Sequence, residues 1–516
     1  MTRCHSRPVS TENRARTLSI AQLLAQPLAQ SAAPYADALT AHARTPWLRL
    51  NVPGHAADPD AFAQLAAFTG DAPLRLDVPP LLDGIDKGAD NPRSQALRLA
   101  AEAWGARRTW FLTNGASQGN RIAVLALRAL SRHTEDAPLV VQRSVHSSVV
   151  DGLVLSGFRA AFVQPSVDHD LGIAHGVTAH DLAVALAEHP DAAAAYVVTP
   201  SYFGAVADVR ALADAAHAAG VPLVVDEAWG AHFGFHPSLP QNALALGADL
   251  VISSTHKLGG SLTQSAMLHL GDGPFADALE PVLDRAFHLT QSTSESALLI
   301  GSLDLTRRRL ATDPGLVETS LRAADLMRDQ IRARGRFAVV GDGFGQFPDI
   351  AAADPLRVAV DTRIGGITGH EAQQLLMTDH QVLVEVATDS AIVAVVGAGA
   401  APDALRFVDA LHALPPQPAP RQEREHLKLP APGEMRMTPR EAFFAPSRAV
   451  PADEAVGRVS AATLAAYPPG IPNVLPGEVV TAELVAFLRD TAATPGGHVR
   501  GAEDPGVRRL RVVAPA

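Results

Sequence analysis

The sequence predicts an α/β fold whose large domain has a mostly parallel sheet, followed by a smaller α+β domain and a C-terminal domain. From about residue 48 to 310, short apolar segments rich in β-branched residues alternate with Ala-rich helical segments. Such segments are typical of strands buried on both faces, and strand–helix–strand repetition favours parallel pairing. Hydrophobic residues make up 47% of the 516 residues and charged residues 19%, so a sizeable core is expected.

The N-terminal part and the large domain are predicted in chain order as follows. Residues 1–45 form an N-terminal arm that is polar and disordered to about residue 18, with a helical pattern from Thr17 to about Arg44. Residues 46–310 form the large domain. Its predicted strands are 109–114, 138–143, 160–165, 195–200, 222–227 and 249–254, and its clearest helices are 117–132, 180–189 and 208–219.

The remaining chain divides into three parts. The smaller α+β domain is predicted over residues 311–414, where RFAVVG, RVAVDT and AIVAVVG have the composition of strands. Residues 415–434 are rich in Pro and charged side chains and are predicted to be a linker. Residues 435–516 are assigned to the C-terminal domain.

Composition and charge exclude several functional classes. The formal net charge is −11, so the basic footprint of a nucleic-acid-binding protein is missing and no nucleic-acid partner is expected. The single cysteine, Cys4, cannot form an internal disulfide or a cysteine-rich metal site. The first residues lack the apolar core of a secretory signal, and no apolar run approaches the roughly 20 residues that span a bilayer. We therefore expect a soluble, cytoplasmic protein without a membrane partner.

A lysine at the end of a predicted strand is the most informative feature. SSTHK, Ser253 to Lys257, follows the strand DLVIS, and ligands of open α/β sheets bind beyond the carboxyl ends of the strands. A lysine there can form an imine with an aldehyde cofactor, and Ser254 and His256 can hydrogen-bond a phosphate. The alternative is a surface lysine in a polar turn, which only the other motifs exclude.

Two further motifs suit the same ligand. In VVDEAWGAH, Asp226 ends an apolar strand, and a carboxylate there can pair with a protonated pyridine nitrogen and make the ring an electron sink. The alternative is a helix N-cap. In TNGASQGN, Thr113 to Asn120, a strand ends in Asn-Gly and a helix starts near Ala116 or Ser117. Free backbone N–H groups at a helix start bind phosphate, although a plain βα turn has the same pattern.

Two weaker motifs follow other strands. His146 in RSVHSSVVDG can lie flat on a pyridine ring, or it can be a structural histidine. In VVTPSYFG, the hydroxyl of Thr199 or Tyr202 can reach a ring oxygen, or the segment is an ordinary Pro turn. The histidines lack HExxH spacing, so no metal is expected, and there is no GxSxG elbow or Walker loop. One Asp, one Lys, one His and one Gly-containing turn, each after its own strand, fit one pocket for pyridoxal 5′-phosphate (PLP).

Together these residues resemble the Orn/Lys/Arg decarboxylase family, which has the aspartate-aminotransferase-like fold, type I among PLP enzymes. NVPGH at 51–55 is similar to the family's TPGH signature, and EAWGARRTWFLTNGAS at 102–117 is similar to its FGA…NG(T/A)S stretch. The C-terminal segments PREAFFAPSRAV, AVGRVSA and YPPGIPNVLPGE resemble a domain that ordinary aminotransferases lack. The core of the resemblance is Gly115-Ala116-Ser117, His146, Asp226-Glu227-Ala228, Gly230-Ala231-His232 and Ser254-Thr255-His256-Lys257.

The resemblance implies a role for each site residue. Lys257 would bond PLP, Asp226 would hold the pyridine nitrogen, and His146 would stack on the ring; with His256 these are the expected catalytic residues. Ser292 and Thr293 in QSTSES would reach the phosphate of a neighbouring subunit, which implies a homodimer or higher homo-oligomer with shared active sites. The full set of expected PLP-binding residues is Gly115, Ala116, Ser117, His146, Thr199, Asp226, Ala228, Ser254, His256, Lys257, Ser292 and Thr293.

The implied reaction is PLP-dependent decarboxylation of a small-molecule substrate: arginine, lysine or ornithine. An acidic group must then meet the distal cation, and Glu478, Asp83 and Asp86 are candidates, although each can equally be a solvated carboxylate. Two alternatives stay open: another PLP reaction on an amino acid, such as transamination or oxidation, and a non-catalytic homologue.

The chain departs from the family pattern at two positions and in one region. Trp229 stands where the family usually has His, which leaves the fine chemistry or the substrate size open, and Glu295 stands where Pro is common. The N-terminal wing of the large inducible members is absent, so the chain resembles the shorter form.

Overall fold

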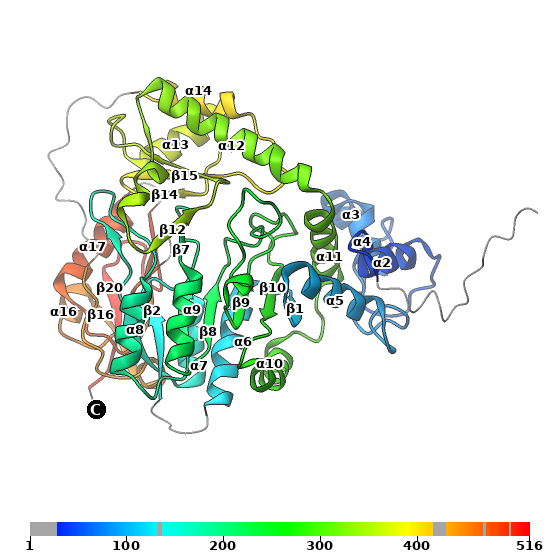
Figure 1. Cartoon of the computed structure of the whole chain (residues 1–516), viewed down its shortest axis with the longest axis horizontal. Coiled ribbons are helices and arrows are strands. Elements are labelled where there is room, and N and C mark those ends of the chain that lie inside the picture. Colours follow the sequence, from blue (N-terminus) through cyan, green and yellow to red (C-terminus); the bar gives the residue numbers. More distant parts are fainter. Residues whose placement is uncertain (1–27, 132–136, 416–429, 468–470, 495–496, 516) are drawn as a thin grey trace, which may run out of the picture.

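The structure is a computed structural model that describes residues 28–131, 137–415, 430–467, 471–494 and 497–515 (Figure 1). The predicted disordered start, the first part of the predicted N-terminal helix and most of the predicted linker lie outside these residues. Helices and strands form one large unit, a small unit that begins at residue 314, and a C-terminal unit, residues 430–515. The residue numbers at which one domain ends and the next begins stay a prediction.

A seven-stranded sheet is the centre of the large unit, in the order β1-β10-β9-β8-β6-β2-β3. The run from β9 to β3 is parallel, and β10 runs antiparallel to both of its neighbours, β1 and β9. The predicted mostly parallel α/β sheet is therefore confirmed, with β10 as an unpredicted addition. The strands are β1 (Arg108–Leu112), β2 (Pro138–Gln142), β3 (Arg159–Val163), β6 (Ala195–Val198), β8 (Leu223–Asp226), β9 (Leu250–Ser253) and β10 (Ala266–Leu270).

Helices cover both faces of this sheet because each has an apolar stripe at helical spacing. On one face lie α6 (Gly115–Leu130), α7 (Ser147–Ser156) and α10 (Ala276–Thr290), which bury residues such as Leu127, Leu153 and Leu283. On the other face lie α8 (Ala179–Glu188) and α9 (Val209–Ala218), with Leu182 and Leu212 buried against the strands. The predicted helices 117–132, 180–189 and 208–219 correspond to α6, α8 and α9.

The N-terminal segment packs beside the sheet, at the right in Figure 1. It contains α2 (Pro34–Arg44), α3 (Ala63–Thr69), α4 (Asp71–Leu76) and α5 (Pro92–Trp104), and α2 lies against α11 (Ala297–Thr312). The fully buried Arg307 on α11 donates to the carbonyl oxygens of Gln30 and Ala32, both at 2.6 Å. Its partner Asp304 accepts the backbone N–H of Tyr35 at 2.9 Å. This buried ion pair fixes the start of α2.

The small unit begins with α12 (Pro314–Arg334) and contains a four-stranded antiparallel sheet in the order β11-β13-β15-β14. Its strands are β11 (Ala338–Val339), β13 (Arg357–Asp361), β14 (Val386–Ala387) and β15 (Ala391–Val395), and α13 (Gly369–His380) and α14 (Ala404–Ala413) pack on it. The predicted strand RFAVVG is only two residues long, because the chain turns into the 3₁₀ helix η2 (Val340–Gln346).

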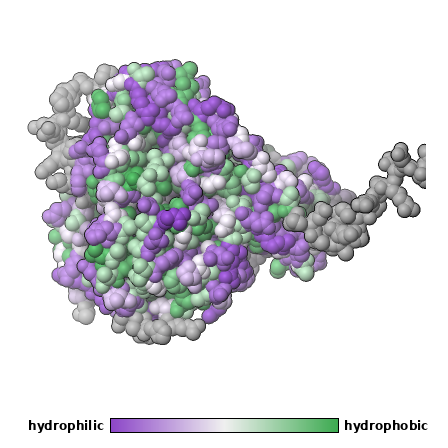
Figure 2. All heavy atoms as spheres, in the orientation of Figure 1, coloured by the Kyte–Doolittle hydropathy of each residue, from purple (hydrophilic) through white to green (hydrophobic). Residues whose placement is uncertain are grey.

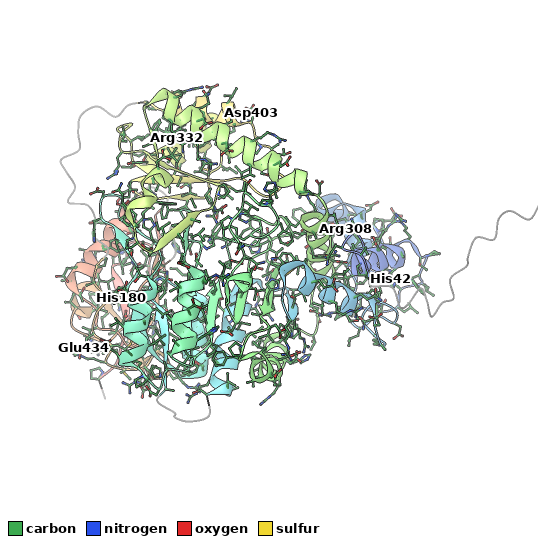
Figure 3. All side chains as sticks on the ribbon, viewed as in Figure 1. His42, His180, Arg308, Arg332, Asp403 and Glu434 are labelled. Carbon is green, nitrogen blue, oxygen red and sulfur yellow. The ribbon has the colours of Figure 1, made fainter. Side chains whose placement is uncertain are left out.

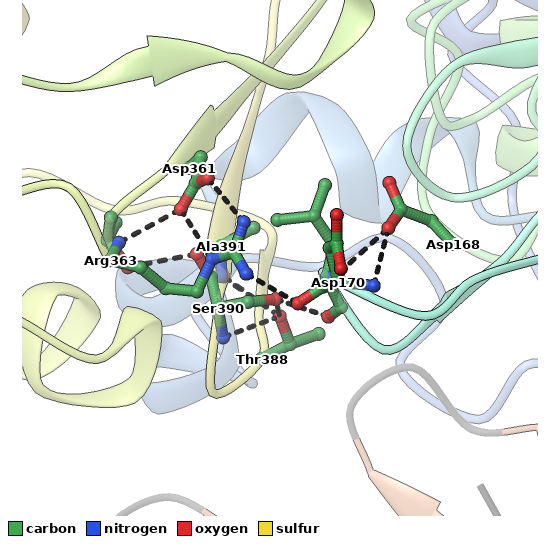
Figure 4. Close-up of polar contacts among 9 residues, drawn as sticks. Asp168, Asp170, Asp361, Arg363, Thr388, Ser390 and Ala391 are labelled. Atoms are coloured by element: carbon green, nitrogen blue, oxygen red, sulfur yellow. Dashed lines mark hydrogen bonds and ion pairs between the residues drawn. The ribbon is translucent and has the colours of Figure 1, made fainter. Parts of the chain in front are cut away.

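Among the contacts that join the small unit to the large unit are a strand pairing and two hydrogen bonds beside it. β12 (Ile350–Ala353) pairs with β7 (Ala205–Ala207) in a shared two-stranded sheet. Beside it, Ser390 Oγ donates to the carbonyl of Leu171 at 2.6 Å, and Arg363 donates to the carbonyl of Asp170 (Figure 4). Both carbonyls lie in the turn between β4 (Val167–Asp168) and β5 (Ile173–Ala174). These bonds place the small unit over the carboxyl ends of the central strands.

The C-terminal unit has its own core, formed by residues such as Leu484, Leu488 and Val512. Its short helix α15 packs against α7 of the large unit. The elements are α15 (Pro439–Phe444), β16 (Ser447–Pro451), α16 (Ala452–Ala455), β17 (Leu464–Tyr467), β18 (Pro472–Val474), α17 (Ala482–Ala493), β19 (His498–Arg500) and β20 (Arg509–Val513).

Polar and apolar residues are intermixed on the face of the molecule shown in Figure 2. Ionisable side chains occur on every unit, as the labels His42, His180, Arg308, Arg332, Asp403 and Glu434 in Figure 3 illustrate. Among the described residues, no helix has both the length and the apolar composition of a membrane span. In the same part of the chain, no group of His, Cys, Asp and Glu side chains is arranged to hold a metal ion.

Candidate active site

The carboxyl ends of the central strands bring the predicted site residues together. β8 lies between β6 and β9, so the residues after these three strands are neighbours at one edge of the sheet. Asp226 ends β8, Thr199 follows β6, and Lys257 follows β9. This edge is where ligands of open α/β sheets bind.

Lys257 has a half-buried amine without a hydrogen-bond acceptor among the residues that the structure describes. Its Nζ lies 3.7 Å from the centroid of the Trp229 ring. Burial lowers the pKa of Lys257 to about 8; Asp226 opposes the fall, and Arg357 adds to it. A substantial fraction of the amine is therefore neutral near pH 8, and only the neutral amine is a nucleophile.

Asp226 has a buried carboxylate that two donors orient. Asn120 Nδ2 donates to Oδ2 at 2.9 Å, and the backbone N–H of Ala228 donates to Oδ1 at 3.0 Å. Asn120 in turn accepts the hydroxyl of the buried Tyr196 at 2.9 Å. Asn120 and Tyr196 were not singled out from the sequence. Asn120 is the last residue of TNGASQGN, but one sequence gives no sign that its amide, on α6, reaches the carboxylate at the end of β8.

His146 is the N-cap of α7, and its Nδ1 lies 2.8 Å from Ser148 Oγ. Burial lowers the pKa of His146; Asp226 opposes the fall, and Lys257 and Arg500 add to it. The imidazole is therefore neutral near pH 7. Ser148 Oγ also accepts from Asn120 Nδ2 at 2.9 Å, so His146 and Asp226 belong to one hydrogen-bond network.

The start of α6 is suited to bind an anion. Gly115 begins the helix with a φ of +72°, and the N-cap residue Asn114 makes no side-chain capping bond. Ala116 and Ser117 lie in the first turn. The N–H of Gly115 donates to the carbonyl of Gln264 at 2.7 Å. The following N–H groups of the first turn are left to attract a phosphate, and the positive end of the helix dipole adds to the attraction.

Three other predicted residues line the same edge. The backbone carbonyl of the buried Ser254 accepts the N–H of Lys257 at 2.9 Å. His256 Nδ1 hydrogen-bonds the carbonyl of Ser265 at 2.8 Å, which leaves Nε2 to contact a ligand. Burial lowers the pKa of His256, although the Ser265 carbonyl opposes the fall. Thr199 Oγ1 accepts the N–H of Ala207 at 2.9 Å.

These groups complement PLP on three sides. Lys257 offers an unpaired amine for an aldehyde, Asp226 a buried carboxylate for a pyridinium, and α6 an uncapped N-terminus for a phosphate. The residues therefore fit this cofactor.

The sequence analysis missed two site residues of the small unit, Arg357 and Glu385. The guanidinium of the buried Arg357 lies 4.1 Å from the centroid of the Trp229 ring, so Trp229 contacts both Arg357 and Lys257. Glu385, an exposed residue just before β14, raises the pKa values of Lys257 and Arg357, which places its charge near the amine. Neither residue lies in a motif of the large domain, so only the folded chain reveals their position.

The three predicted substrate-binding acids have different surroundings. Glu478 is buried and accepts from Arg143 Nη2 at 3.1 Å. Asp83 is exposed and lies 3.6 Å from Lys87. The side chain of Asp86 is buried, accepts the N–H of Leu82 at 3.1 Å and lies 3.8 Å from Arg93.

The segment 291–296 contains both exposed and buried residues. Ser292 and Thr293 are exposed. Glu295, which stands where the family commonly has Pro, is buried in an ion pair with Arg93 and accepts from Gln291 at 2.6 Å. Gln291 also donates to Thr113 Oγ1 at 3.1 Å, just before the anion-binding turn. The ion pair is thus linked to the start of α6.

Comparison with protein families and with characterised relatives gives a consistent result. The family model "Orn/Lys/Arg decarboxylase, major domain" matches residues 33–344, and "Orn/Lys/Arg decarboxylase, C-terminal domain" matches residues 422–496. An arginine decarboxylase of Bacillus subtilis is 34% identical over 94% of this chain and 99% of its own length. An arginine decarboxylase of Halalkalibacterium halodurans is also 34% identical, over 94% of this chain and 98% of its own length.

Solved structures share the fold. The lysine decarboxylase LdcF of Francisella novicida has a TM-score of 0.77 at 19% identity, covering 93% of this chain and 81% of that one. The constitutive lysine decarboxylase of E. coli has a TM-score of 0.75 at 20% identity, covering 94% and 82%.

Proposed function

The chain belongs to the Orn/Lys/Arg decarboxylase family, and from this premise we propose that it converts arginine to agmatine and CO2 with PLP bound at Lys257. It is a decarboxylase of basic amino acids with the α/β fold of the type I PLP enzymes. Arginine is supported by the relatives named arginine decarboxylase, which match over 94% of this chain. A lysine decarboxylase of Pseudomonas aeruginosa is 25% identical over only 53% of it.

The proposal for PLP rests on the surroundings of Lys257 and Asp226. Lys257 would hold the aldehyde carbon, Asp226 the pyridine nitrogen, the first turn of α6 the phosphate, and His146 one face of the ring. When bound, PLP accepts the electron pair that the breaking bond between Cα and the carboxylate releases. Thr199, Ala228, Ser254 and His256 lie at the same edge of the sheet and would complete the cofactor site.

The chain's own residues would move the protons. Whenever its amine is free of the cofactor, Lys257 can take up and release a proton, because its pKa is lowered to about 8. After CO2 leaves, Cα must gain one proton to give the amine product. Lys257 Nζ would supply it as the ammonium, because it lies beyond the carboxyl end of β9. His256 Nε2 would do so only in the imidazolium form, since in the neutral ring the proton is on Nδ1, bonded to the Ser265 carbonyl. The neutral His146 would contact the ring without placing a second cation beside it.

A carboxylate must meet the guanidinium of the substrate, since a cation without an anion would lose its solvation on binding. Glu478, Asp83 and Asp86 remain proposals for this role. Glu385 joins them because its charge already acts on Lys257. Substitution of each by its amide, with KM for arginine as the readout, separates the four.

We propose a cytoplasmic homodimer or higher homo-oligomer with shared active sites. The N-terminal segment exposes several large apolar side chains, which a second copy of the chain would cover. Ser292 and Thr293 are exposed close to the anion-binding turn of their own chain and are free to contact another subunit. The exposed large apolar residues of the segment are Trp47, Leu48, Leu50, Val52, Phe62, Leu65, Phe68 and Leu81.

A substrate panel tests the reaction. Purified protein with PLP is incubated with arginine, lysine and ornithine, and CO2, amine products and keto acids are measured separately. Release of CO2 with agmatine from arginine, and its loss in Lys257→Ala, is the expected result. A keto acid without CO2 would identify another PLP reaction, and CO2 mainly from lysine or ornithine would correct the substrate.

A further inference from the structure

We infer that the C-terminal unit sets the position of His146. This residue lies at the start of α7, and the C-terminal unit contacts α7 at both ends of the helix. The inference rests on the proposed function only where it assigns His146 to the face of PLP. The contacts themselves join α7 and the turn before it to three parts of the C-terminal unit. Arg143, Arg440 and Arg500 are accordingly positioning residues.

The first contact is made by Arg143, three residues before His146 and directly after β2. This buried guanidinium donates from Nη1 to the carbonyl of Pro472 at 2.6 Å, and from Nη2 to the carbonyl of Asn473 at 3.2 Å. Nη2 also donates to both carboxylate oxygens of Glu478, at 3.3 and 3.1 Å. All these acceptors lie in or just after β18. A planar guanidinium with several acceptors fixes direction as well as distance.

The second contact lies directly beside the imidazole. Arg500, the last residue of β19, donates from Nη1 to Ser147 Oγ at 3.1 Å. Ser147 is the residue after His146 and the first of α7. The next residue, Ser148, bonds both His146 and Asn120, and Asn120 bonds Asp226. A shift of this helix end would therefore disturb the supports of the carboxylate together with the imidazole.

The third contact is at the other end of α7. Arg440 on α15 donates from Nη1 to the carbonyl of Leu155 at 2.7 Å. This carbonyl lies in the last turn of α7, so it accepts no hydrogen bond from within the helix. Gly157, the C-cap residue, allows α15 to come close: a Cβ there would lie 3.2 Å from Arg440 Cδ. Both ends of α7 are thus fixed by arginines of the C-terminal unit.

The packing of α7 on its inner side explains why an outer support matters. Gly152 faces Val124 of α6 so closely that a Cβ would lie 2.9 Å from Val124 Cβ. Glycine allows this approach, and Val149 and Leu153 hold α7 against the core through apolar contacts, which are not directional. The polar contacts at the two ends add the directional restraint on the N-cap residue His146.

The test uses the full-length protein, without and with PLP, carrying Arg440→Gln, Arg500→Gln or both substitutions. Both arginines are exposed, so the substitutions leave the core of each unit intact. Arg489→Gln is the matched control, because Arg489 pairs with Asp453 at 2.7 Å inside the same unit and away from α7. Arg500→Lys keeps a charged donor and is the rescue variant.

The first measurement is hydrogen–deuterium exchange of the backbone around residues 143–157 in the protein without PLP. We expect faster exchange in the double variant than in the control, and a partial return toward the wild-type rate with Arg500→Lys. This measurement does not depend on the reaction. Exchange in this segment equal to that of Arg489→Gln would overturn the inference.

The second measurement follows the consequence for the site. In the holoenzyme, the double variant should change the visible circular dichroism of bound PLP and lower kcat by roughly tenfold or more, while KM changes less. The control, Arg489→Gln, should change neither the dichroism of bound PLP nor kcat. An altered exchange rate with unchanged dichroism and kcat would also overturn the inference, because the helix would move without effect on the site. If the wild-type protein fails to bind PLP or to release CO2, the proposed function is refuted. The exchange data would still decide whether the C-terminal unit holds α7 and the turn before it.

Discussion

The groups around the Lys257 amine shift its pKa in opposite directions. Burial and Arg357 disfavour the ammonium form, whereas Asp226 and Glu385 favour it, and the outcome is a pKa of about 8. The Trp229 ring, 3.7 Å from Nζ, adds a cation–π contact that stabilises the charged form. The protonation state of one side chain therefore depends on residues from both the large and the small unit.

The rate at which PLP bonds to the protein should consequently depend on pH. Below the pKa of Lys257 the ammonium has no lone pair, so the rate should rise with pH and level off above about 8. Stopped-flow absorbance after mixing PLP with PLP-free protein measures this rate. Lys257→Ala should show no covalent phase. A midpoint near the ordinary lysine value would contradict the lowered pKa.

Asp226→Asn should lower the rate of catalysis without preventing PLP from binding. The substitution preserves size and removes the charge that would pair with the pyridine nitrogen, so kcat should fall roughly a hundredfold or more while PLP still binds. Steady-state CO2 release and the visible spectrum measure the two effects. Asp151→Asn, a partly exposed carboxylate on α7, is the control and should retain near-normal kcat. Full activity in Asp226→Asn would rule out the assigned role.

At the scale of elements, close packing between helices limits which residues are tolerated. α6 and α7 meet at Gly152, where an added methyl group would lie 2.9 Å from Val124. Gly152→Ala should therefore lower the free energy of unfolding by about 1–3 kcal/mol through overpacking. Gly345→Ala is the control, since a Cβ there meets no atom within 4 Å. Chemical denaturation measures both, and equal stability of the two variants would contradict the tight contact.

The elements differ in how well the sequence predicted them. β2, β8 and β9 were located to within a residue or two, because apolar β-branched runs bounded by polar residues have few other structures. β10, Ala266–Leu270, was missed: AMLHL has no β-branched residue and suits a helix equally well. RFAVVG was predicted as a full strand, but its last two residues, Val340 and Gly341, belong to a 3₁₀ helix.

The sequence also predicted only part of the active site, namely the residues that lie close to the end of a strand. Asp226 ends its strand, and Lys257 and His146 follow theirs within a few residues, so local sequence indicates where they lie. Asn120, Arg357 and Glu385 reach the site through tertiary contacts between distant segments, and neither periodicity nor spacing in one sequence contains that information.

At the scale of the whole molecule, the exposed N-terminal segment predicts association. Leu48 and Leu50 are 85% and 89% exposed. The double variant Leu48→Asp/Leu50→Asp should shift the protein to monomers and reduce activity, because charged residues oppose burial at an interface. Sedimentation velocity with parallel CO2 assays measures this. Leu383→Asp, at an 82% exposed position of the small unit, is the control. An unchanged oligomeric state would place the interface elsewhere.

The buried pair of Arg93 and Glu295 has a consequence for recombination between homologues. The two residues are far apart in the chain. Among the described residues, Glu295 pairs with no other cation, and the one further carboxylate beside Arg93 is that of Asp86, at 3.8 Å. A chimera with a crossover between them would inherit one buried ion without its mate, at a cost of about 3–5 kcal/mol. Gene shuffling should therefore yield folded progeny mainly when both positions come from the same parent.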